Sequence, residues 1–298
     1  MTAAPMEARN SPDDPGLRRS PRETGGPRED PPARRATHSA KQTGGPREDP
    51  PSRRATRSAK TTGGRLDGAA LLRALRAAYA AEGDPRRARD MQAYMKSAMP
   101  FHGVPMARTR ALARELVKDA RPADAQQLWA AVRALWHGAK FREERYAALE
   151  LLSRPWARKL ESPDALPLYE ELISTGAWWD LVDELAAHRV GSLLAQWPDE
   201  VKSVLRRWSR GGDLWLRRAA IIAQLRHREA TDVDLLFEVI EPAVGEKEFF
   251  LKKAIGWALR ELARWKPRDV ERWLSEHEGR AAGLTVREAR RGLERGRR

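Results

Sequence analysis

The sequence predicts an all-α fold in which helical hairpins stack side by side into a solenoid. Apolar residues recur at helical spacing along residues 66–298. No window of that region alternates β-branched and polar residues in the way a strand does. A chain with roughly a dozen helices exceeds a four-helix bundle, whereas stacked hairpins that each bury one face against the next accommodate them.

The composition divides the chain at residue 65. All 11 Trp lie between Trp129 and Trp273, and residues 1–65 contain none. Residues 24–42 recur almost unchanged as residues 43–61, and this repeat is rich in Pro, Gly and Arg. Such a segment has little to bury, so residues 1–65 are predicted to be a disordered basic tail. Two purposes remain open for it: an arm that adds affinity for phosphates, or a duplicated linker with no task of its own.

The charge favours a polyanionic partner. The chain carries 56 basic and 42 acidic side chains, and the net charge is +14. Residues 1–65 supply 14 basic and 8 acidic side chains, so residues 66–298 keep an excess of eight positive charges. A basic folded region fits nucleic acid, and an anionic membrane surface would fit the charge as well. No apolar run approaches the roughly 18 residues that cross a bilayer.

Cysteine is absent, which excludes disulfides, thiolate zinc sites and cysteine nucleophiles. The six His form no i, i+4 pair with a Glu between them, so we expect neither a metal nor a cofactor. The N-terminal residues lack the pattern of a secretory or organelle signal, and we therefore expect a cytoplasmic protein.

The helices can be placed from their apolar faces. Leu72, Leu75 and Tyr79 follow the i, i+3, i+7 pattern, and residues 128–136 give a near-ideal two-turn face. Similar faces predict helices over 106–119, 140–153, 164–175, 178–189, 199–209, 212–226, 231–242, 248–264 and 285–295. Chain breakers between the helices include Asp84-Pro85, Arg121-Pro122, Trp197-Pro198, Gly211-Gly212 and Lys266-Pro267. Two-helix units then recur about every 35–40 residues, within the range of HEAT-like repeats.

Trp179 and Asp183 do not fit a simple core helix. Trp178, Leu181 and Val182 share an ordinary core stripe, whereas Trp179 and Asp183, at i and i+4, lie on a neighbouring face. The pair is consistent either with a half-buried Trp beside a solvated Asp or with a functional site.

Arg218 occupies the apolar stripe of Leu214, Ile221 and Leu225. A guanidinium in such a place needs a carboxylate, a phosphate or an aromatic face as its partner. A structural salt bridge and a ligand contact both remain open.

The segment from Phe250 to Arg260 is the third unusual region. Phe250 and Trp257 run along one face, and Gly256 allows another element to approach the backbone closely. Lys253 and Arg260, seven residues apart, mark a basic edge. By spacing alone, Trp257 could equally be an ordinary core residue.

At these segments the sequence resembles the AlkD-type family of DNA alkylation repair glycosylases. The resemblance covers about residues 70–292, and its blocks occur in the family's order. The matching blocks are Tyr94-Met95-Lys96, Phe101-His102-Gly103-Val104, Trp178 to Asp183, Trp215 to Ala220, Lys247 to Phe250 and Lys253 to Glu261.

The resemblance implies a right-handed α-solenoid of HEAT-like hairpins whose concave basic face holds duplex DNA without metal or cofactor. It implies excision of N3- and N7-alkylated purines, with Asp183 as the catalytic carboxylate. Trp179 and Trp257 would be aromatic walls beside the sugar, and Arg218 would hold a backbone phosphate. Further DNA contacts are expected from Tyr94, Lys96, Arg217, Lys253 and Arg260.

This chemistry requires few groups. A purine alkylated at N3 or N7 is cationic and leaves as a neutral base, so we expect a site without a His or a second catalytic carboxylate. Pro105, before Met106, departs from the family pattern, in which many relatives have a polar residue, and one DNA contact is expected to differ. We expect a monomer.

Two alternatives stay open at this point. The first is a non-catalytic HEAT-like protein that binds damaged or branched DNA, and the second is a protein-binding scaffold. Release of free methylpurine from methylated duplex DNA would distinguish the enzyme from both.

Overall fold

The computed structural model describes residues 66–296 of the chain. The tandem repeat at residues 24–61, with its predicted disorder, lies outside these residues. The described residues contain helices and no strand, which confirms the all-α prediction. The helices are α1 (Gly68–Glu82), α2 (Pro85–Met95), α3 (Met106–Val117), α4 (Ala125–Gly138), α5 (Arg142–Leu152), α6 (Pro155–Arg158), α7 (Leu166–Gly176), α8 (Trp179–Glu184), α9 (Gly191–Gln196), α10 (Pro198–Arg210), α11 (Leu214–Ile222), α12 (Val233–Ile240), α13 (Phe249–Leu262), α14 (Pro267–Glu276) and α15 (Gly283–Gly296).

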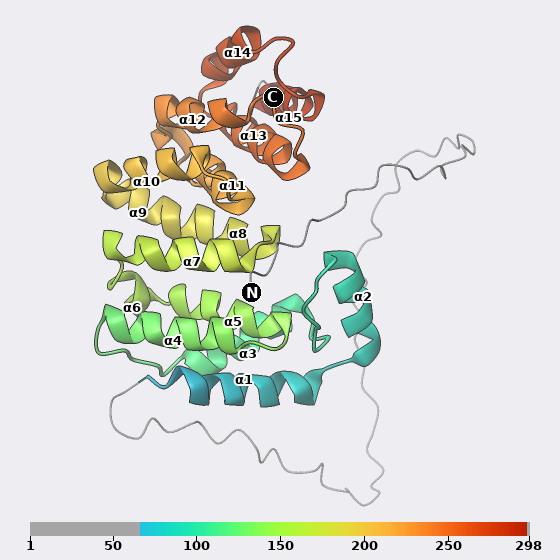
Figure 1. Cartoon of the computed structure of the whole chain (residues 1–298), viewed down its shortest axis with the longest axis vertical. Coiled ribbons are helices and arrows are strands. Elements are labelled where there is room, and N and C mark those ends of the chain that lie inside the picture. The colour runs from blue at the N-terminus through green and yellow to red at the C-terminus, as the bar shows by residue number, and fades with distance from the viewer. Residues whose placement is uncertain (1–65, 297–298) are drawn as a thin grey trace, which may run out of the picture. The chain divides into compact units, whose positions relative to one another are not determined.

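Successive helices stack upon one another as a solenoid requires. Figure 1 shows them in chain order, from α1 at one end of the stack to α14 and α15 at the other. The most extensive contacts join α1 to α4, α3 to α5, α4 to α5, α10 to α11, α11 to α13, and α13 to α15. Each element therefore packs against near neighbours in the chain, and the predicted α-solenoid is confirmed.

Helix α2 differs from the rest because it lies beside the stack rather than within it (Figure 1). Its start is fixed by Asp84, whose carboxylate accepts the backbone N–H groups of Arg86 and Arg87 at 2.8 and 3.0 Å. Pro85 occupies the first helical position, where a missing N–H has no cost. Met95 is the one residue of α2 that is buried. One side of α2 faces the stack across the site described below.

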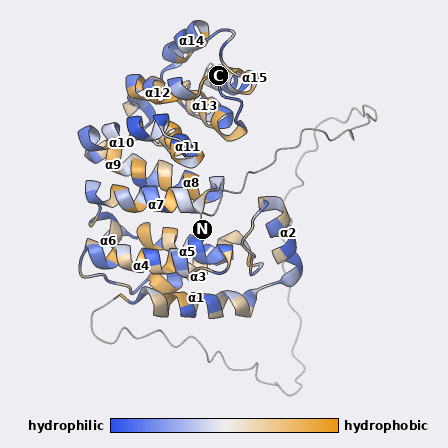
Figure 2. Cartoon of the chain, viewed as in Figure 1, coloured by the Kyte–Doolittle hydropathy of each residue, from blue (hydrophilic) through white to orange (hydrophobic). Residues whose placement is uncertain are grey.

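The core is continuous along the stack. Trp136, Trp208 and Trp273 are fully buried, each at a different level of it. Figure 2 shows hydrophobic and hydrophilic residues on the same helices, as expected when each helix buries one face. The close approach predicted at Gly256 is also present: a Cβ there would lie 2.9 Å from the Cβ of Glu288 on α15.

The helix predicted over 178–189 is longer than expected. After α8 the chain forms a π-helical segment, Leu185–Val190, and continues directly into α9. Leu181, Val182 and Leu185 are fully buried, as their stripe predicted. π-Helical turns are rare and occur often at functional sites, and this one follows the residues that the sequence singles out.

The first turn of α5 anchors the loop between α2 and α3. The Glu143 side chain is fully buried and accepts the backbone N–H groups of His102, Gly103 and Val104 at 3.0, 2.9 and 3.3 Å. Gly103 has a φ of +84°, a conformation that favours glycine. One carboxylate thus satisfies three loop donors and fixes the path of the loop.

We expect Glu143→Ala to lower the free energy of unfolding by about 3 kcal/mol or more, because it leaves buried N–H groups without acceptors. Urea unfolding followed by circular dichroism measures the loss. Glu115→Ala is the matched control, since Glu115 is 65% exposed and pairs with Lys118 on the surface. Equal midpoints for the two variants would contradict the anchoring role of Glu143.

Candidate active site

Residues that lie far apart in the sequence meet at one cavity of about 680 Å³, here called the site cavity. Tyr94 of α2, Trp179 and Asp183 of α8, and Trp257 of α13 all line it. Trp179 is 37% exposed and Tyr94 is 79% exposed, so both rings are accessible to a ligand. The structure therefore brings together four of the residues that the sequence analysis named.

Asp183 is bound by Arg218 through two parallel hydrogen bonds. The Nε and Nη2 groups of Arg218 donate to Oδ1 and Oδ2 of Asp183 at 2.8 and 2.7 Å. A third donor, Nη1, reaches the carbonyl oxygen of Phe250 at 2.9 Å. The Arg218 side chain is 4% exposed and that of Asp183 is 17% exposed. The guanidinium is thus buried behind the carboxylate, and the carboxylate faces the cavity.

This geometry corrects the expectation for Arg218. The resemblance implied a phosphate as its partner, whereas the structure gives it Asp183 and a backbone carbonyl. Of the two readings left open by the sequence, the buried salt bridge is the one observed. Arg218 itself is buried, at 3% exposed, and does not line the site cavity.

A cluster of three aromatic rings lies beside the ion pair. Trp178, Trp215 and Phe250 have ring centroids 4.9–5.8 Å apart, in tilted or edge-on arrangements. The Arg218 guanidinium lies 6.0 Å from the centroid of the Phe250 ring. Apolar surroundings of this kind strengthen the interaction between the charges and hold the pair in place.

Burial raises the pKa of the Asp183 carboxyl above its ordinary value. The hydrogen bonds and charge of Arg218 oppose this effect, as does the charge of Lys253, while the negative charge of Asp180 adds to it. The protonation state of Asp183 therefore depends on the arginine behind it.

The site cavity holds more titratable side chains than the sequence analysis named, and whether any of them is catalytic stays a prediction. Asp180, Glu184, Glu261 and His188 also line the site cavity. Asp180 is held by Arg142 and Tyr146 of α5. The sequence contained the signal, because Asp180 lies three residues before Asp183 and therefore on the same side of a helix.

Four of the expected DNA contacts do not line the site cavity. Arg217 donates to Glu246 at 2.8 Å and to a backbone carbonyl, and Arg260 is ion-paired with Glu288. Lys96 ends α2 in the left-handed conformation and is exposed. Lys253 is exposed, with its Nζ 5.6 Å from the centroid of the Phe249 ring. The cationic groups of Arg217 and Arg260 thus have carboxylate partners within the protein.

Two arginines that the sequence analysis did not name do line the site cavity. Arg110 of α3 lies 3.9 Å from Glu150 and 3.8 Å from Glu184, both long for ion pairs. Arg226, just after α11, is exposed. Neither follows an unusual pattern in the sequence, so spacing offered no signal for them.

The α2 side of the site cavity is apolar. Met91 and Met95 of α2, Phe101 of the following loop and Met106 at the start of α3 line it. Met106 follows Pro105, the residue at which the sequence departs from the family pattern, and it is 38% exposed. Flexible methionine side chains on this wall face the two tryptophans of α8 and α13.

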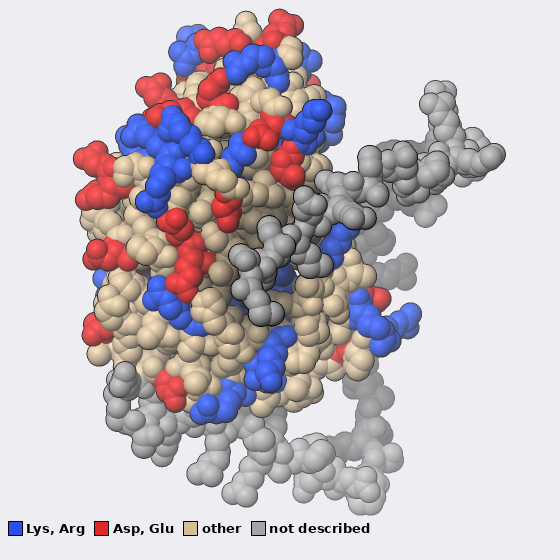
Figure 3. Space-filling view, in the orientation of Figure 1, with Lys and Arg blue, Asp and Glu red and all other residues tan. Residues whose placement is uncertain are grey.

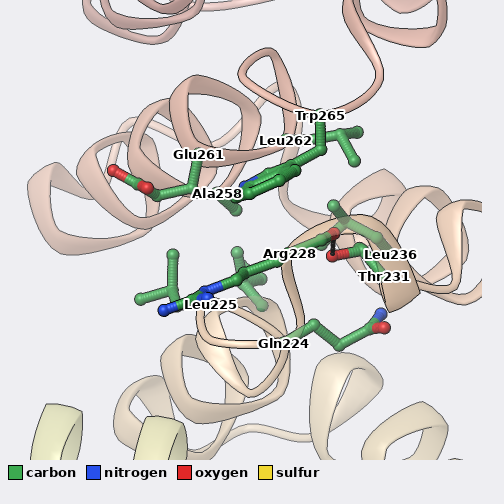
Figure 4. A pocket seen from close by; sticks show the side chains of 10 residues that line it. Gln224, Leu225, Arg228, Thr231, Leu236, Ala258, Glu261, Leu262 and Trp265 are labelled. Carbon is green, nitrogen blue, oxygen red and sulfur yellow. Dashed lines mark hydrogen bonds between the residues drawn. The ribbon is translucent and has the colours of Figure 1, made fainter.

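A second hollow, shown in Figure 4, is too small for a substrate. Its volume of about 10 Å³ has room for a single water. Trp265 and Arg228 lie on opposite sides of it in Figure 4, and Thr231 donates to the backbone carbonyl of Arg228. Leu225 and Glu261 line this hollow and the site cavity alike.

Basic and acidic side chains lie interspersed on the face seen in Figure 3. Four ion pairs join partners that are 35–38 residues apart in the chain: Arg133–Glu171, Arg142–Asp180, Arg207–Glu170 and Arg218–Asp183. This separation matches the repeat length expected from the sequence.

Within residues 66–296, no group of three or more His, Cys, Asp or Glu is arranged to hold a metal ion. Within the same residues, no helix has both the length and the apolar character needed to cross a membrane.

Comparisons with known proteins point to one family. Residues 75–293 match the family model described as DNA alkylation repair enzyme. A solved structure, described as a predicted DNA alkylation repair enzyme from Enterococcus faecalis, is 30% identical in sequence, with a TM-score of 0.62. The match covers 70% of this chain and 95% of that one. A search among curated proteins found no match.

Proposed function

Because the chain belongs to the DNA alkylation repair enzyme family, we propose that it is a DNA glycosylase. Its substrate would be duplex DNA that contains cationic N3- or N7-alkylated purines, and the reaction would hydrolyse the N-glycosidic bond. The observation that carries the proposal is the Asp183 carboxylate, which faces a cavity lined by two indoles, those of Trp179 and Trp257.

The leaving group decides which catalytic groups are needed. An alkylated purine carries a positive charge, so it takes the electrons of the broken C1′–N bond and leaves as a neutral base. The sugar then carries positive charge; water forms a bond to C1′ and releases one proton to the solvent, which leaves a neutral sugar with a hydroxyl group at C1′. A fixed anion beside the sugar lowers the energy of this transition state, as preorganised charges do elsewhere.

Asp183 suits this role because part of its hydrogen-bonding capacity is unused. A carboxylate has about four acceptor positions, and Arg218 occupies one on each oxygen. The remaining positions, on a side chain that is 17% exposed, are available to a sugar cation or to the attacking water.

The two indoles supply further attraction for positive charge. The face of a Trp ring binds a cation with roughly 0.5–2 kcal/mol, depending on desolvation. Trp179 and Trp257 come from α8 and α13, so they approach the site cavity from different elements. Both the charged base and the developing sugar cation would benefit.

Arg218 has a positioning role in this proposal. It fixes the direction of the Asp183 carboxylate by two hydrogen bonds and lowers the pKa of that carboxyl against the effect of burial. The proposed mechanism requires Asp183 to be ionised when the substrate binds, and Arg218 favours that form.

Phosphate contacts are assigned instead to Arg226 and Arg110, which line the site cavity; the nearest carboxylate oxygens to Arg110 lie at 3.8 and 3.9 Å, long for ion pairs. We expect Arg226→Ala to raise the Kd for undamaged duplex DNA about threefold to tenfold and to reduce the salt slope of binding by about one. Fluorescence anisotropy at several salt concentrations measures both.

Arg210→Ala is the matched control, because Arg210 is exposed and pairs with Glu238 away from the site cavity. Arg210→Ala removes the same charge and should reduce the salt slope of DNA binding less than Arg226→Ala does. An Arg226→Ala slope equal to that of Arg210→Ala would contradict a specific phosphate contact.

One assay tests the proposed function. The protein is incubated with duplex DNA that contains N7-methylguanine, and free base is measured by chromatography and mass spectrometry. Release of the base supports the glycosylase. Binding without release indicates a non-catalytic protein that recognises DNA, and the absence of both indicates a scaffold. The activity is proposed for the monomer.

A further inference from the structure

Helix α8 carries two carboxylates one turn apart, and each is held by an arginine from a different neighbour. Asp183 is bound by Arg218 of α11, and Asp180 is bound by Arg142 of α5. The two arginines therefore reach α8 from the hairpins on either side of it. Both carboxylates line the site cavity.

The contacts of Asp180 differ from those of Asp183 in one respect. Arg142 donates to both of its oxygens, with the Nε–Oδ2 distance at 3.1 Å, and the Tyr146 hydroxyl donates to Oδ2. Three of about four acceptor positions on Asp180 are thus occupied by the protein. The side chains of Arg142 and Asp180 are 5% and 10% exposed. Asp180 has little capacity left for a substrate.

We propose that Asp180, held by Arg142 and Tyr146, is a positioning residue that fixes the setting of Asp183 in the site cavity. The proposal rests on the function proposed above for Asp183. Asp180 does not act on the substrate itself. Through Arg142 and Tyr146 it fixes the α8 backbone to α5, while Arg218 fixes the next turn of α8 to α11.

The start of α8 lacks a side-chain cap, because Trp178, which precedes it, offers no side chain to accept the free N–H groups. At its other end, α8 passes into the π-helical segment Leu185–Val190 rather than into a regular turn. The direction of the Asp183 side chain therefore depends on side-chain contacts with the neighbouring helices.

The first turn of α5 also fixes the loop that forms the opposite wall of the site cavity. Arg142 binds Asp180, and the next residue, Glu143, binds the loop that carries Phe101. The backbone N–H of Arg142 also donates to the carbonyl of Pro100 in that loop. Two walls of the site cavity are thus fixed by consecutive residues.

Asp180 also acts on Asp183 through its charge. The charged groups that affect Asp183 are Arg218 from α11, Lys253 from α13 and Asp180 from α8 itself. Because Asp180 raises the pKa of Asp183 and Arg218 lowers it, their removal should shift that pKa in opposite directions. If Asp180 had a purely structural role, its removal would not shift the pKa of Asp183 in the direction opposite to the removal of Arg218.

The test uses Asp180→Asn and Tyr146→Phe in the full chain. We expect Asp180→Asn to reduce the single-turnover excision rate about a hundredfold, the scale of a misplacement by about 1 Å, with the Kd for DNA within about twofold of wild type. The ¹³C titration midpoint of Asp183, assigned with Asp183→Asn, should move to lower pH. Tyr146→Phe removes one hydrogen bond and should slow excision about tenfold.

Asp199→Asn is the control for the loss of one negative charge, because Asp199 is exposed on α10 and does not line the site cavity. Wild-type excision by both test variants, or an Asp183 midpoint in Asp180→Asn equal to that in Asp199→Asn, overturns the inference. If wild-type protein releases no base, the proposed function fails, and the titration still decides whether Asp180 acts on Asp183. Tyr146→Phe keeps the charge pair with Arg142 and so remains informative if Asp180→Asn does not fold.

Discussion

Asp183→Asn is expected to reduce the rate of base release about a thousandfold, the scale seen when a preorganised electrostatic group is removed. The variant keeps the size of the side chain and one oxygen that can accept from Arg218, but it has no negative charge to place beside the sugar. Binding to undamaged duplex DNA should stay within about twofold of wild type, since Arg110 and Arg226 are unchanged. Single-turnover kinetics with N7-methylguanine duplex measures the rate.

Asp199→Asn serves as the control, because it changes the net charge by the same amount at an exposed position of α10. It should excise at the wild-type rate. Full release of the methylated base by Asp183→Asn would remove Asp183 from the mechanism and leave the cavity without its assigned anion.

Arg218→Ala is expected to have the second largest effect, on stability and on activity together. It leaves Asp183 without its partner, and breaking a buried ion pair costs about 3–5 kcal/mol. The cost should lie near the lower end of that range, because the Asp183 side chain is 17% exposed. Urea unfolding measures this loss.

The same variant should change the pH dependence of excision. Arg218 lowers the pKa of Asp183, so its removal raises that pKa further above the ordinary value. Because Asp183 must be ionised to act, the acidic limb of the rate profile should move to higher pH. The salt slope of DNA binding should stay the same, since the buried guanidinium contacts Asp183 and a backbone carbonyl.

Arg217→Ala is the matched control for Arg218→Ala. Arg217 is the preceding residue on α11, but it pairs with Glu246, which does not line the site cavity. Its loss should leave the acidic limb in place. An acidic limb that moves equally in both variants would contradict the specific role of Arg218.

The helical fold could be predicted from the sequence because apolar periodicity reports which face of each helix is buried. The prediction of individual helices failed where a helix buries few side chains. Helix α2 has one buried residue and gave no apolar face to detect, and α14, which buries Val270 and Trp273, was not predicted either. The dipeptides Asp84-Pro85 and Lys266-Pro267 were interpreted as breaks, whereas in each case the proline is the first residue of a helix.

The site was accessible from the sequence only in part. Spacing alone allowed Trp257 to be core and Asp183 to be solvated, and it was the resemblance to a family that favoured their functional interpretation. Spacing cannot show that α2, α8 and α13 line the same cavity, because their contacts are made through the fold. The partner of Arg218 was uncertain for the same reason, since Asp183 is 35 residues away in the chain.

Asp180 illustrates a different limit. Its position three residues before Asp183 was visible in the sequence, yet a carboxylate on a helix is usually exposed to solvent. Only its contacts with Arg142 and Tyr146 distinguish a buried, fully bound carboxylate from a solvated one.

The place of α8 in the stack has a mechanical consequence. Tyr94 and Trp257 belong to elements near opposite ends of the described chain. Helix α8, which carries Asp183, lies between them and is bound from both sides, by Arg142 and by Arg218. A change in the curvature of the stack would therefore move the two outer rings relative to each other more than it would move the Asp183 carboxylate. The width available to a ligand could then vary while the charge of Asp183 keeps its place.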